Sequence, residues 1–145
     1  MKPAEFLSKE DEKLIVAAIE KAEEQTSGEI RVHIESSCKS EVLDRAVNVF
    51  KLLSLHKTKE RNGVLFYMSV KDRKFAIIGD AGINAVVPKD FWDTTKETVL
   101  DHFKKGEFTQ GLIKGIEMAG NHLKQYFPHQ KDDVNELSDE ISYGK

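Results

Sequence analysis

The 145-residue sequence predicts a three-layer α/β/α sandwich, in which helices flank a small mixed β-sheet. Two observations predict this class. Segments with apolar residues at helical spacing lie before, between and after short strand-like segments. Residues 37–63, which include one helix, separate the first two strands. Because a crossover of that length joins parallel strands, we expect these two strands to be parallel.

The first helix is predicted to begin after Ser8, a residue type that caps helices, with Asp11 three residues later. Its apolar residues recur at helical spacing as far as Ala22, and Gly28 favours the turn that ends it. Residues 29–35 alternate apolar and polar side chains, so they predict a strand with one buried face.

A second helix is predicted after Ser40, because the apolar residues of 42–53 form an amphipathic stripe. Residues 64–70 are apolar on both faces, as in a central strand that is covered on both sides. Residues 71–73 predict a short hairpin turn, and residues 74–78 predict the strand that returns antiparallel to the one before it.

Two further helices complete the predicted body. The first is expected to open at Pro88 and to end at residues 104–106. The second carries inward residues from Leu112 to Leu123, and Pro128 stops it. These helices and the three strands make up a single predicted domain over residues 1–128.

Motifs of well-known enzyme sites are absent from the sequence. Gly115 and Gly120 have the spacing of a phosphate-binding loop, but they lie in a predicted helix, where they favour close helix packing. Arg45 stands seven residues after Cys38, whereas cysteine phosphatases place an arginine six residues after the cysteine. The histidines show no metal-ligand spacing, although His33, on the polar side of the first strand, can pair with a neighbouring acid.

The net charge of −3 lies wholly in residues 131–145, which hold five acids and two bases. Residues 1–130 hold equal numbers of acids and bases, which argues against a broadly basic surface for nucleic acids. A single cysteine forms no disulfide within the chain, which suits a reducing compartment. No signal peptide or membrane-spanning stretch is readable. We therefore expect a cytoplasmic monomer that binds neither nucleic acid nor membranes.

The predicted tail, residues 129–145, is polar and acidic. Its composition favours a solvated, disordered segment. The alternative is a short segment that docks onto the body or onto an unknown protein partner, because Val134, Leu137 and Ile141 are spaced three and four residues apart.

A set of ordered motifs resembles the TPM domain family. The motifs are an Asn-Gly-Val-Leu strand at residues 62–67, an Asp-Arg turn at 71–73, a glycine-rich strand end at 78–83, a Thr-Ser-Gly lead-in at 26–30 and a Gly-Glu-Phe helix start at 106–108. The resemblance covers residues 5–127. It implies a bacterial TPM domain with the α/β/α sandwich fold. It also implies divalent-cation binding, notably of calcium, and weak acid phosphatase activity, both of which are attributed to some members.

Carboxylates are predicted to gather where the two parallel strands end. Glu35 ends the first strand, Asp72 follows the second, and Asp44 lies in the first turns of the second helix. Carboxylate oxygens are ligands that Ca²⁺ and Mg²⁺ prefer, so these residues predict a metal site. Asp80, at the other end of the hairpin, is a separate candidate ligand. The structural alternatives are a turn role for Asp72, a helix-dipole role for Asp44 and a solvated strand-end role for Glu35.

Two functions follow from these observations. The first is binding of a Ca²⁺ or Mg²⁺ cofactor at the strand-end edge, with weak hydrolysis of phosphate esters. The second is a non-enzymatic protein-interaction or accessory module without catalysis. The sequence identifies no catalytic nucleophile and no general base.

Overall fold

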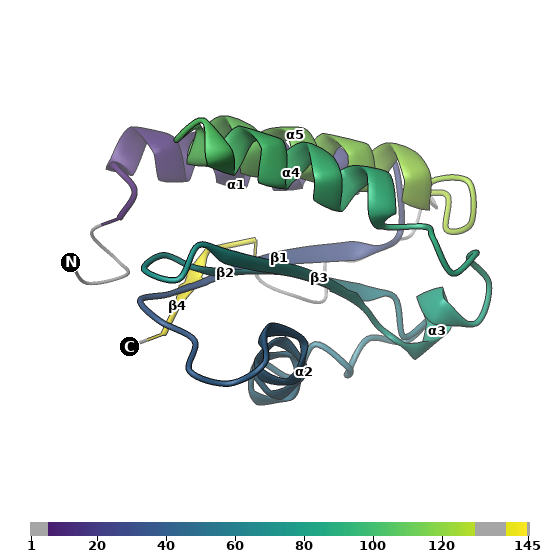
Figure 1. Ribbon diagram of the computed structural model, residues 1–145. Helices are drawn as coiled ribbons and strands as arrows, with labels where there is room; N and C mark the ends of the chain where they lie inside the picture. Colours follow the sequence, from purple (N-terminus) through teal and green to yellow (C-terminus); the bar gives the residue numbers. More distant parts are fainter. Residues whose placement is uncertain (1–5, 130–138, 145) are drawn as a thin grey trace.

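The computed structural model describes residues 6–129 and 139–144, and its elements form three layers (Figure 1). Three helices cover one face of the sheet: α1 (Lys9–Glu23), α4 (Asp93–Lys104) and α5 (Phe108–Leu123). The sheet contains β1 (Glu29–Glu35), β2 (Gly63–Ser69), β3 (Lys74–Gly79) and β4 (Ser142–Tyr143). Helix α2 (Val42–Leu52) covers the other face, and the short α3 (Ala81–Asn84) lies at one end. The predicted α/β/α sandwich is confirmed.

The strands are ordered β3-β2-β1-β4 in the sheet. Strands β1 and β2 are parallel, in a register that runs from Glu29 opposite Gly63 to Glu35 opposite Ser69. Strand β3 is antiparallel to β2, as the short turn between them requires. Both predicted pairings are therefore confirmed, and β1 and β2 end at the same edge.

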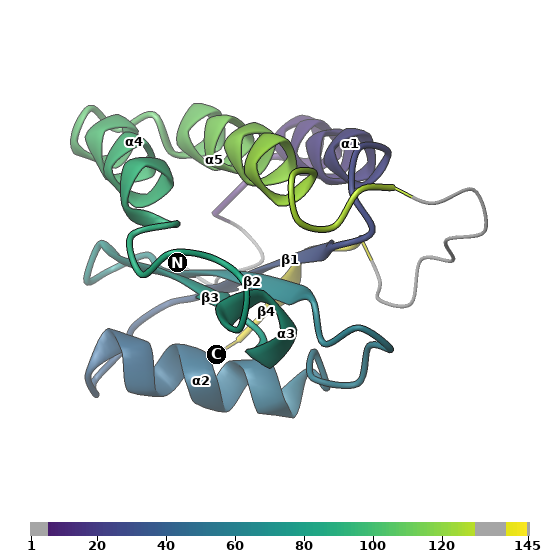
Figure 2. The same cartoon turned by 90° about the vertical axis from the view of Figure 1, so that its right-hand side faces the viewer.

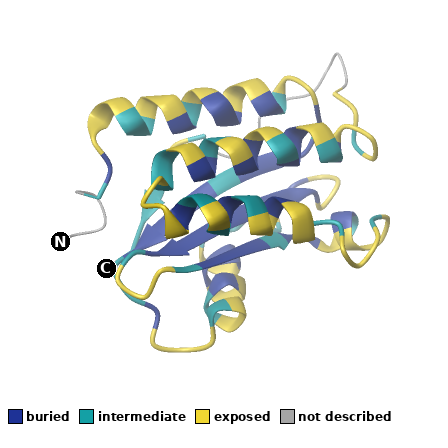
Figure 3. Cartoon of the chain, turned by 45° about the horizontal axis from the view of Figure 1, so that its top comes forward, coloured by how far each residue is buried: buried dark blue, intermediate teal, exposed yellow. Residues whose placement is uncertain are grey.

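The two faces of β1 enter different cores. Ile30, Val32 and Ile34 are buried in the larger core, which includes buried residues of α1, α4 and α5. The strands of the sheet are largely buried (Figure 3). The intervening His33 and Glu35 are also buried, although they are polar. They lie on the α2 side, since side chains alternate between the two faces of a strand. Burying a charge is costly unless it has partners, so this face of β1 must contain those partners.

Helix starts follow local capping chemistry. Ser8 caps α1 as predicted, because its Oγ accepts the Asp11 backbone N–H at 3.0 Å. The cap of α2 is Glu41, whose Oε2 accepts the Leu43 N–H at 2.8 Å, and the prediction of Ser40 is wrong. Helix α4 begins at Asp93 instead of Pro88, because turn hydrogen bonds span residues 88–93.

Helix α5 lies between α1 and α4 at close range (Figure 2). A Cβ atom at Gly120 would lie 2.9 Å from the Cβ of Ala22 on α1. A Cβ atom at Gly115 would lie 2.5 Å from a methyl carbon of Val99 on α4. These glycines therefore allow close helix packing, as the sequence indicated.

The end of the predicted tail joins the sheet. Strand β4 pairs in parallel with β1, and the Gly144 N–H donates to the Ile34 carbonyl at 2.8 Å. The Tyr143 hydroxyl donates to Glu12 on α1 at 2.7 Å, and Ile141 packs against the larger core. Residues 139–144 therefore lie against the body in the structure. Val134 and Leu137 lie outside the described residues, and the domain boundary at residue 128 stays a prediction.

Candidate functional site: a buried charge cluster at the sheet edge

The buried carboxylate of Glu35 has partners from three elements. Arg45 on α2 donates to it with Nε, at 3.0 Å from Oε2, and with Nη2 to Oε1. The Tyr67 hydroxyl on β2 donates to Oε2 at 2.5 Å, and His33 Nε2 lies 3.2 Å from Oε1. His33 Nδ1 lies 2.7 Å from the hydroxyl of Ser142 on β4. We call His33, Glu35, Arg45 and Tyr67 the Glu35 cluster.

The environment fixes the charge states of the Glu35 cluster. Burial raises the pKa of Glu35, but hydrogen bonds from Arg45, Tyr67 and His33 outweigh it, so that the pKa falls to about 2. Burial lowers the pKa of His33 despite the nearby carboxylate, which favours the neutral imidazole. Burial and the bond to Glu35 raise the pKa of Tyr67. The cluster therefore holds one carboxylate and one guanidinium, whose charges cancel.

The loop after β1 is tied to the β2–β3 turn. Asp72 accepts the backbone N–H of Cys38 and the Ser69 hydroxyl, the latter at 3.0 Å. The Lys74 ammonium donates to the Cys38 carbonyl at 3.3 Å. The bond from the Cys38 N–H is the largest effect that lowers the pKa of Asp72, so this exposed carboxyl is ionised. Asp72 thus fixes the loop beside the Glu35 cluster.

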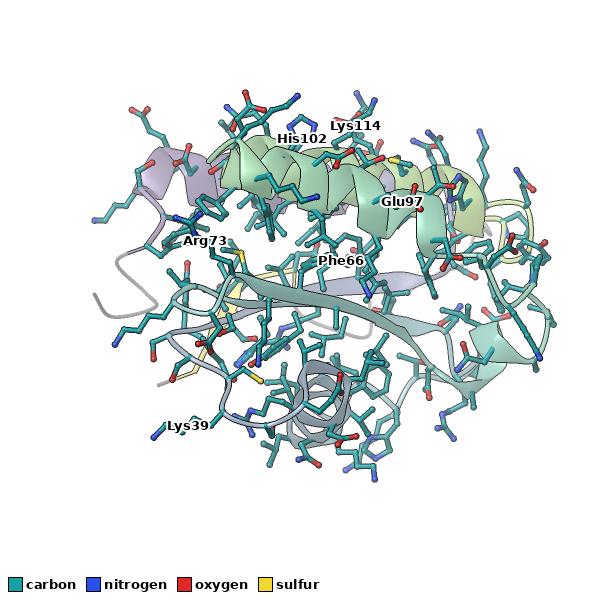
Figure 4. All side chains as sticks on the ribbon, in the orientation of Figure 1. Lys39, Phe66, Arg73, Glu97, His102 and Lys114 are labelled. Carbon is teal, nitrogen blue, oxygen red and sulfur yellow. The ribbon has the colours of Figure 1, made fainter. Side chains whose placement is uncertain are left out.

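A cavity of about 450 Å³ opens beside the Glu35 cluster, between the end of β1 and α2. The apolar wall of the cavity is formed by Val49 and Leu52 of α2 and by Leu53, the C-cap of that helix. Lys39 and Arg45 line it as well, and Lys39 lies at the end of the molecule that carries the β2–β3 turn (Figure 4). Cavities of this size are typical of small-molecule sites.

The structure brings only part of the predicted metal site together. Glu35 and Asp72 lie at the same sheet edge, because Glu35 pairs with Ser69 at the end of β2. Asp44 is exposed in the first turn of α2. Asp80 lies at the other end of the hairpin, where it forms an ion pair with Arg61 and caps α3 through the Ala81 N–H.

The predicted carboxylates do not fit a divalent cation as a set. Both oxygens of Glu35 accept hydrogen bonds within the cluster, and both oxygens of Asp80 accept hydrogen bonds from Arg61. One oxygen of Asp72 accepts two more. Across residues 6–129 and 139–144, no three histidine, cysteine or acidic side chains are grouped as metal ligands. A cation at Glu35 would have to replace Arg45.

Sequence reasoning missed the partner of Glu35. The spacing of Arg45 from Cys38 does not indicate this role, whereas in the structure the Arg45 guanidinium bonds Glu35. The apolar pattern of residues 64–70 does not distinguish Tyr67, whose hydroxyl also bonds Glu35. A usable signal was present, because an acid at a strand end and an arginine in the first turns of the next helix lie at the same sheet edge. The pairing of His33 with a neighbouring acid is confirmed.

A second titratable group lies where residues 139–144 meet α1. Burial, together with a hydrogen bond to Asp139, raises the pKa of Glu23 to about 9. Glu23 Oε2 also accepts the backbone N–H of Ile30 at 3.0 Å, and this bond opposes the rise in pKa. Glu23 is therefore protonated at neutral pH.

The layers, the parallel β1–β2 pair and the Glu35 cluster define a small α/β/α domain with a charge cluster buried at its sheet edge. The chain belongs to the TPM domain family, because the family model for the TPM domain matches residues 1–122. The resemblance seen in the sequence motifs is therefore confirmed.

Solved structures agree with this assignment. The BA42 protein of the psychrophilic bacterium Bizionia argentinensis is 54% identical, with a TM-score of 0.92 and 97% of each chain covered. The N-terminal domain of a P. gingivalis protein is 18% identical, with a TM-score of 0.70, over 88% of this chain and 83% of that one. The N-terminal domain of the cg2496 protein of Corynebacterium glutamicum is 13% identical, with a TM-score of 0.65, over 97% and 81%. The last two show the fold alone.

No curated protein matches the chain. Within the part of the chain that the structure describes, no helix is long and apolar enough to cross a bilayer. The cytoplasmic location and the monomeric state stay predictions.

Proposed function

We propose that the chain is a non-catalytic binding domain that takes a small anionic ligand, of the phosphate-ester class, in the cavity beside the Glu35 cluster. One observation carries this proposal. Lys39 lines the cavity, while Glu35, the carboxylate among the described residues that line it, is neutralised by Arg45.

The charge balance of the cavity favours an anion. Because the charges of Glu35 and Arg45 cancel and His33 is neutral, Lys39 leaves the lining with a net positive charge. The Lys74 ammonium lies nearby, on the Cys38 carbonyl. Apolar atoms of Leu52 and Leu53 would contact the uncharged part of an ester.

The same geometry gives little support for hydrolysis. A general base should have a pKa near the working pH, whereas the Glu35 carboxylate is a weak base with a pKa of about 2. Both ring nitrogens of His33 are engaged, by Ser142 and Glu35. The Cys38 thiol is buried and bonds the Ser40 carbonyl. These groups form a rigid binding wall instead of a nucleophile with its base.

The test is an amide NMR titration of the full chain with phenyl phosphate. We expect saturable shifts at residues 33–39 and 45–53, and weaker binding by Lys39→Gln. Lys124→Gln, on the exposed cap of α5, is the matched control and should bind as wild type does. Absence of saturable shifts, or equal binding by both variants, would contradict the proposal. If wild type released phosphate from phenyl phosphate and Lys39→Gln did not, the function would be catalytic, and the proposal of a binding domain without catalysis would be wrong.

Divalent-cation binding is the second candidate function. The observation that favours it is Asp72, which is exposed and ionised at the predicted strand-end edge. Asp44 is exposed at the start of the adjacent helix. The site would use Asp72 with backbone or hydroxyl oxygens, and Glu35 would stay with Arg45. Such a sparse ligand set would bind Ca²⁺ or Mg²⁺ weakly.

The test is a Ca²⁺ and Mg²⁺ titration of wild type and Asp72→Asn, followed by amide shifts. We expect shifts at residues 36–40 and 69–74 that Asp72→Asn abolishes. Shifts confined to residues 23, 29 and 139 would place the cation away from the strand-end edge and contradict this site. Unchanged spectra would contradict cation binding altogether.

A further inference from the structure

A second cavity, of about 640 Å³, lies at the end of the molecule opposite the Glu35 cluster. The residues that line it belong to the second half of α2, the segment 56–61, the end of β3 and α3. Val47, Phe50 and Ile78 give it an apolar wall, and Lys51, His56 and Arg61 line it as well. Its volume and mixed lining are those of a small-molecule site.

The walls of this cavity are held in place without a ligand. Arg61 Nε and Nη2 donate to the two carboxylate oxygens of Asp80, at 2.7 and 2.9 Å. Asp80 also accepts the Ala81 N–H at 2.7 Å, and the side chain of Asn84 donates to the Gly79 carbonyl at 3.1 Å. A preformed cavity spares a ligand the entropy cost of ordering its site.

The polar groups left over favour an anion. Asp80 is the acidic residue among the described residues that line the cavity, and Arg61 neutralises it. Lys51 therefore leaves a net positive charge. The Nδ1 atom of His56 is closed to solvent, so it lies behind the surface of the cavity and out of reach of a ligand.

We propose that this second cavity binds a small monocarboxylate with an apolar body. The carboxylate accepts a hydrogen bond from the Lys51 ammonium. The apolar body covers Val47 and Ile78, beside Phe50. This site is independent of the anion site at the Glu35 cluster, because the two cavities share no lining residue.

The test is an amide NMR titration of the full chain with 2-naphthoate, compared with the uncharged 2-naphthalenemethanol. We expect saturable shifts at residues 47–51, 56–61 and 78–84 for the acid, and weaker ones for the alcohol. Lys51→Gln should weaken binding about three- to fivefold, the effect of one exposed ion pair. Lys57→Gln is the control, because Lys57 is exposed on the neighbouring segment and does not line the cavity.

Four results would overturn the proposal. The first three are the absence of saturable shifts in those segments, equal binding of the acid and the alcohol, and an unchanged affinity of Lys51→Gln. Shifts confined to residues 33–39 would place the acid in the Glu35 cavity, and this outcome also overturns the second site. Lys51 is an exposed residue, so its variant should fold, and its amide spectrum checks that it does.

Discussion

Arg45 and Glu35 form an ion pair across two layers of the sandwich, in which the glutamate side chain is 4% exposed and the arginine side chain is 34% exposed. The arginine belongs to α2 and the glutamate ends β1. This pair therefore fixes the position of α2 against the sheet edge, in addition to the apolar contacts of the buried α2 residues Ala46, Val49 and Phe50.

Replacing Arg45 with methionine should lower the free energy of unfolding by about 2–3 kcal/mol at pH 7. The buried Glu35 carboxylate would lose its cation, and removal of one partner of a buried pair is costly. The exposed side of Arg45 reduces the effect. Urea unfolding followed by circular dichroism measures it.

The loss of unfolding free energy caused by Arg45→Met should depend on pH. The lowered pKa of Glu35 gives wild type stability that is present above about pH 4.5 and lost as the pH falls toward 2. The difference between wild type and Arg45→Met should therefore shrink at pH 3. The double variant Glu35→Gln/Arg45→Met should be more stable than Arg45→Met at pH 7. Equal losses at both pH values would mean that the arginine acts through packing alone.

Replacing Glu23 with glutamine should stabilise the protein at alkaline pH. The pKa of Glu23 is raised, so the stability that its protonated form gives is complete below about pH 4.5 and is lost as the pH rises through about 9. Glutamine stays neutral throughout this range. We expect a gain of about 1 kcal/mol at pH 8 and little change at pH 4.

Thermal unfolding at pH 4, 6 and 8 measures this effect. Glu24→Gln is the matched control, because Glu24 is the exposed neighbour of Glu23. A pH profile of Glu23→Gln that runs parallel to that of wild type would show that Glu23 does not carry the dependence.

Replacing Gly82 with alanine should lower the free energy of unfolding by about 2 kcal/mol, because overpacking against fixed atoms is destabilising. The added Cβ would overlap the Glu60 carbonyl oxygen and lie 2.6 Å from the Arg61 carbonyl oxygen. Both are backbone atoms, which cannot rotate away as a side chain can. Ala81→Gly, which changes helix propensity without a clash, is the control. Equal midpoints of urea unfolding for the two variants would contradict the close approach.

Deleting residues 139–145 should lower the free energy of unfolding by about 2 kcal/mol, through lost apolar burial and lost hydrogen bonds. The deletion removes Ile141 from the larger core and the Tyr143–Glu12 hydrogen bond. Amide hydrogen exchange in β1 should become faster, while exchange in β3 changes less. Tyr143→Phe removes only the hydroxyl and separates its contribution. An unchanged exchange rate in β1 would show that β4 adds no stability.

Much of the fold follows from periodic patterns in the sequence. The alternation in residues 29–35 and the helical stripes of α1, α2 and α5 predict their elements because each pattern spans several turns or pleats. The two missed elements, α3 and β4, contain four and two residues, too few to show a period. Their positions depend on tertiary contacts, namely the Asp80 cap and the β1 edge.

The location of the site could be predicted from the sequence, but the partners of its charged side chains could not. The end of β1 and β2 could be located because parallel strands end at one edge. Whether Glu35 binds a metal ion or the Arg45 guanidinium depends on which side of α2 faces the sheet. A rotation of that helix by one residue would turn Arg45 away, and no spacing in the sequence measures such a rotation. Asp80 looked similar to Asp72, and only the fold puts Arg61 beside it.

The position of β4 beside β1 also has a consequence for biosynthesis. Among the four strands of the described sheet, β4 is translated last and its partner β1 is translated first. One edge of β1 therefore remains without its strand while α2, β2, β3, α4 and α5 are translated. Contacts between such distant segments form slowly, because a long loop must close first. During that interval the open edge of β1 is exposed to pairing with the wrong strand.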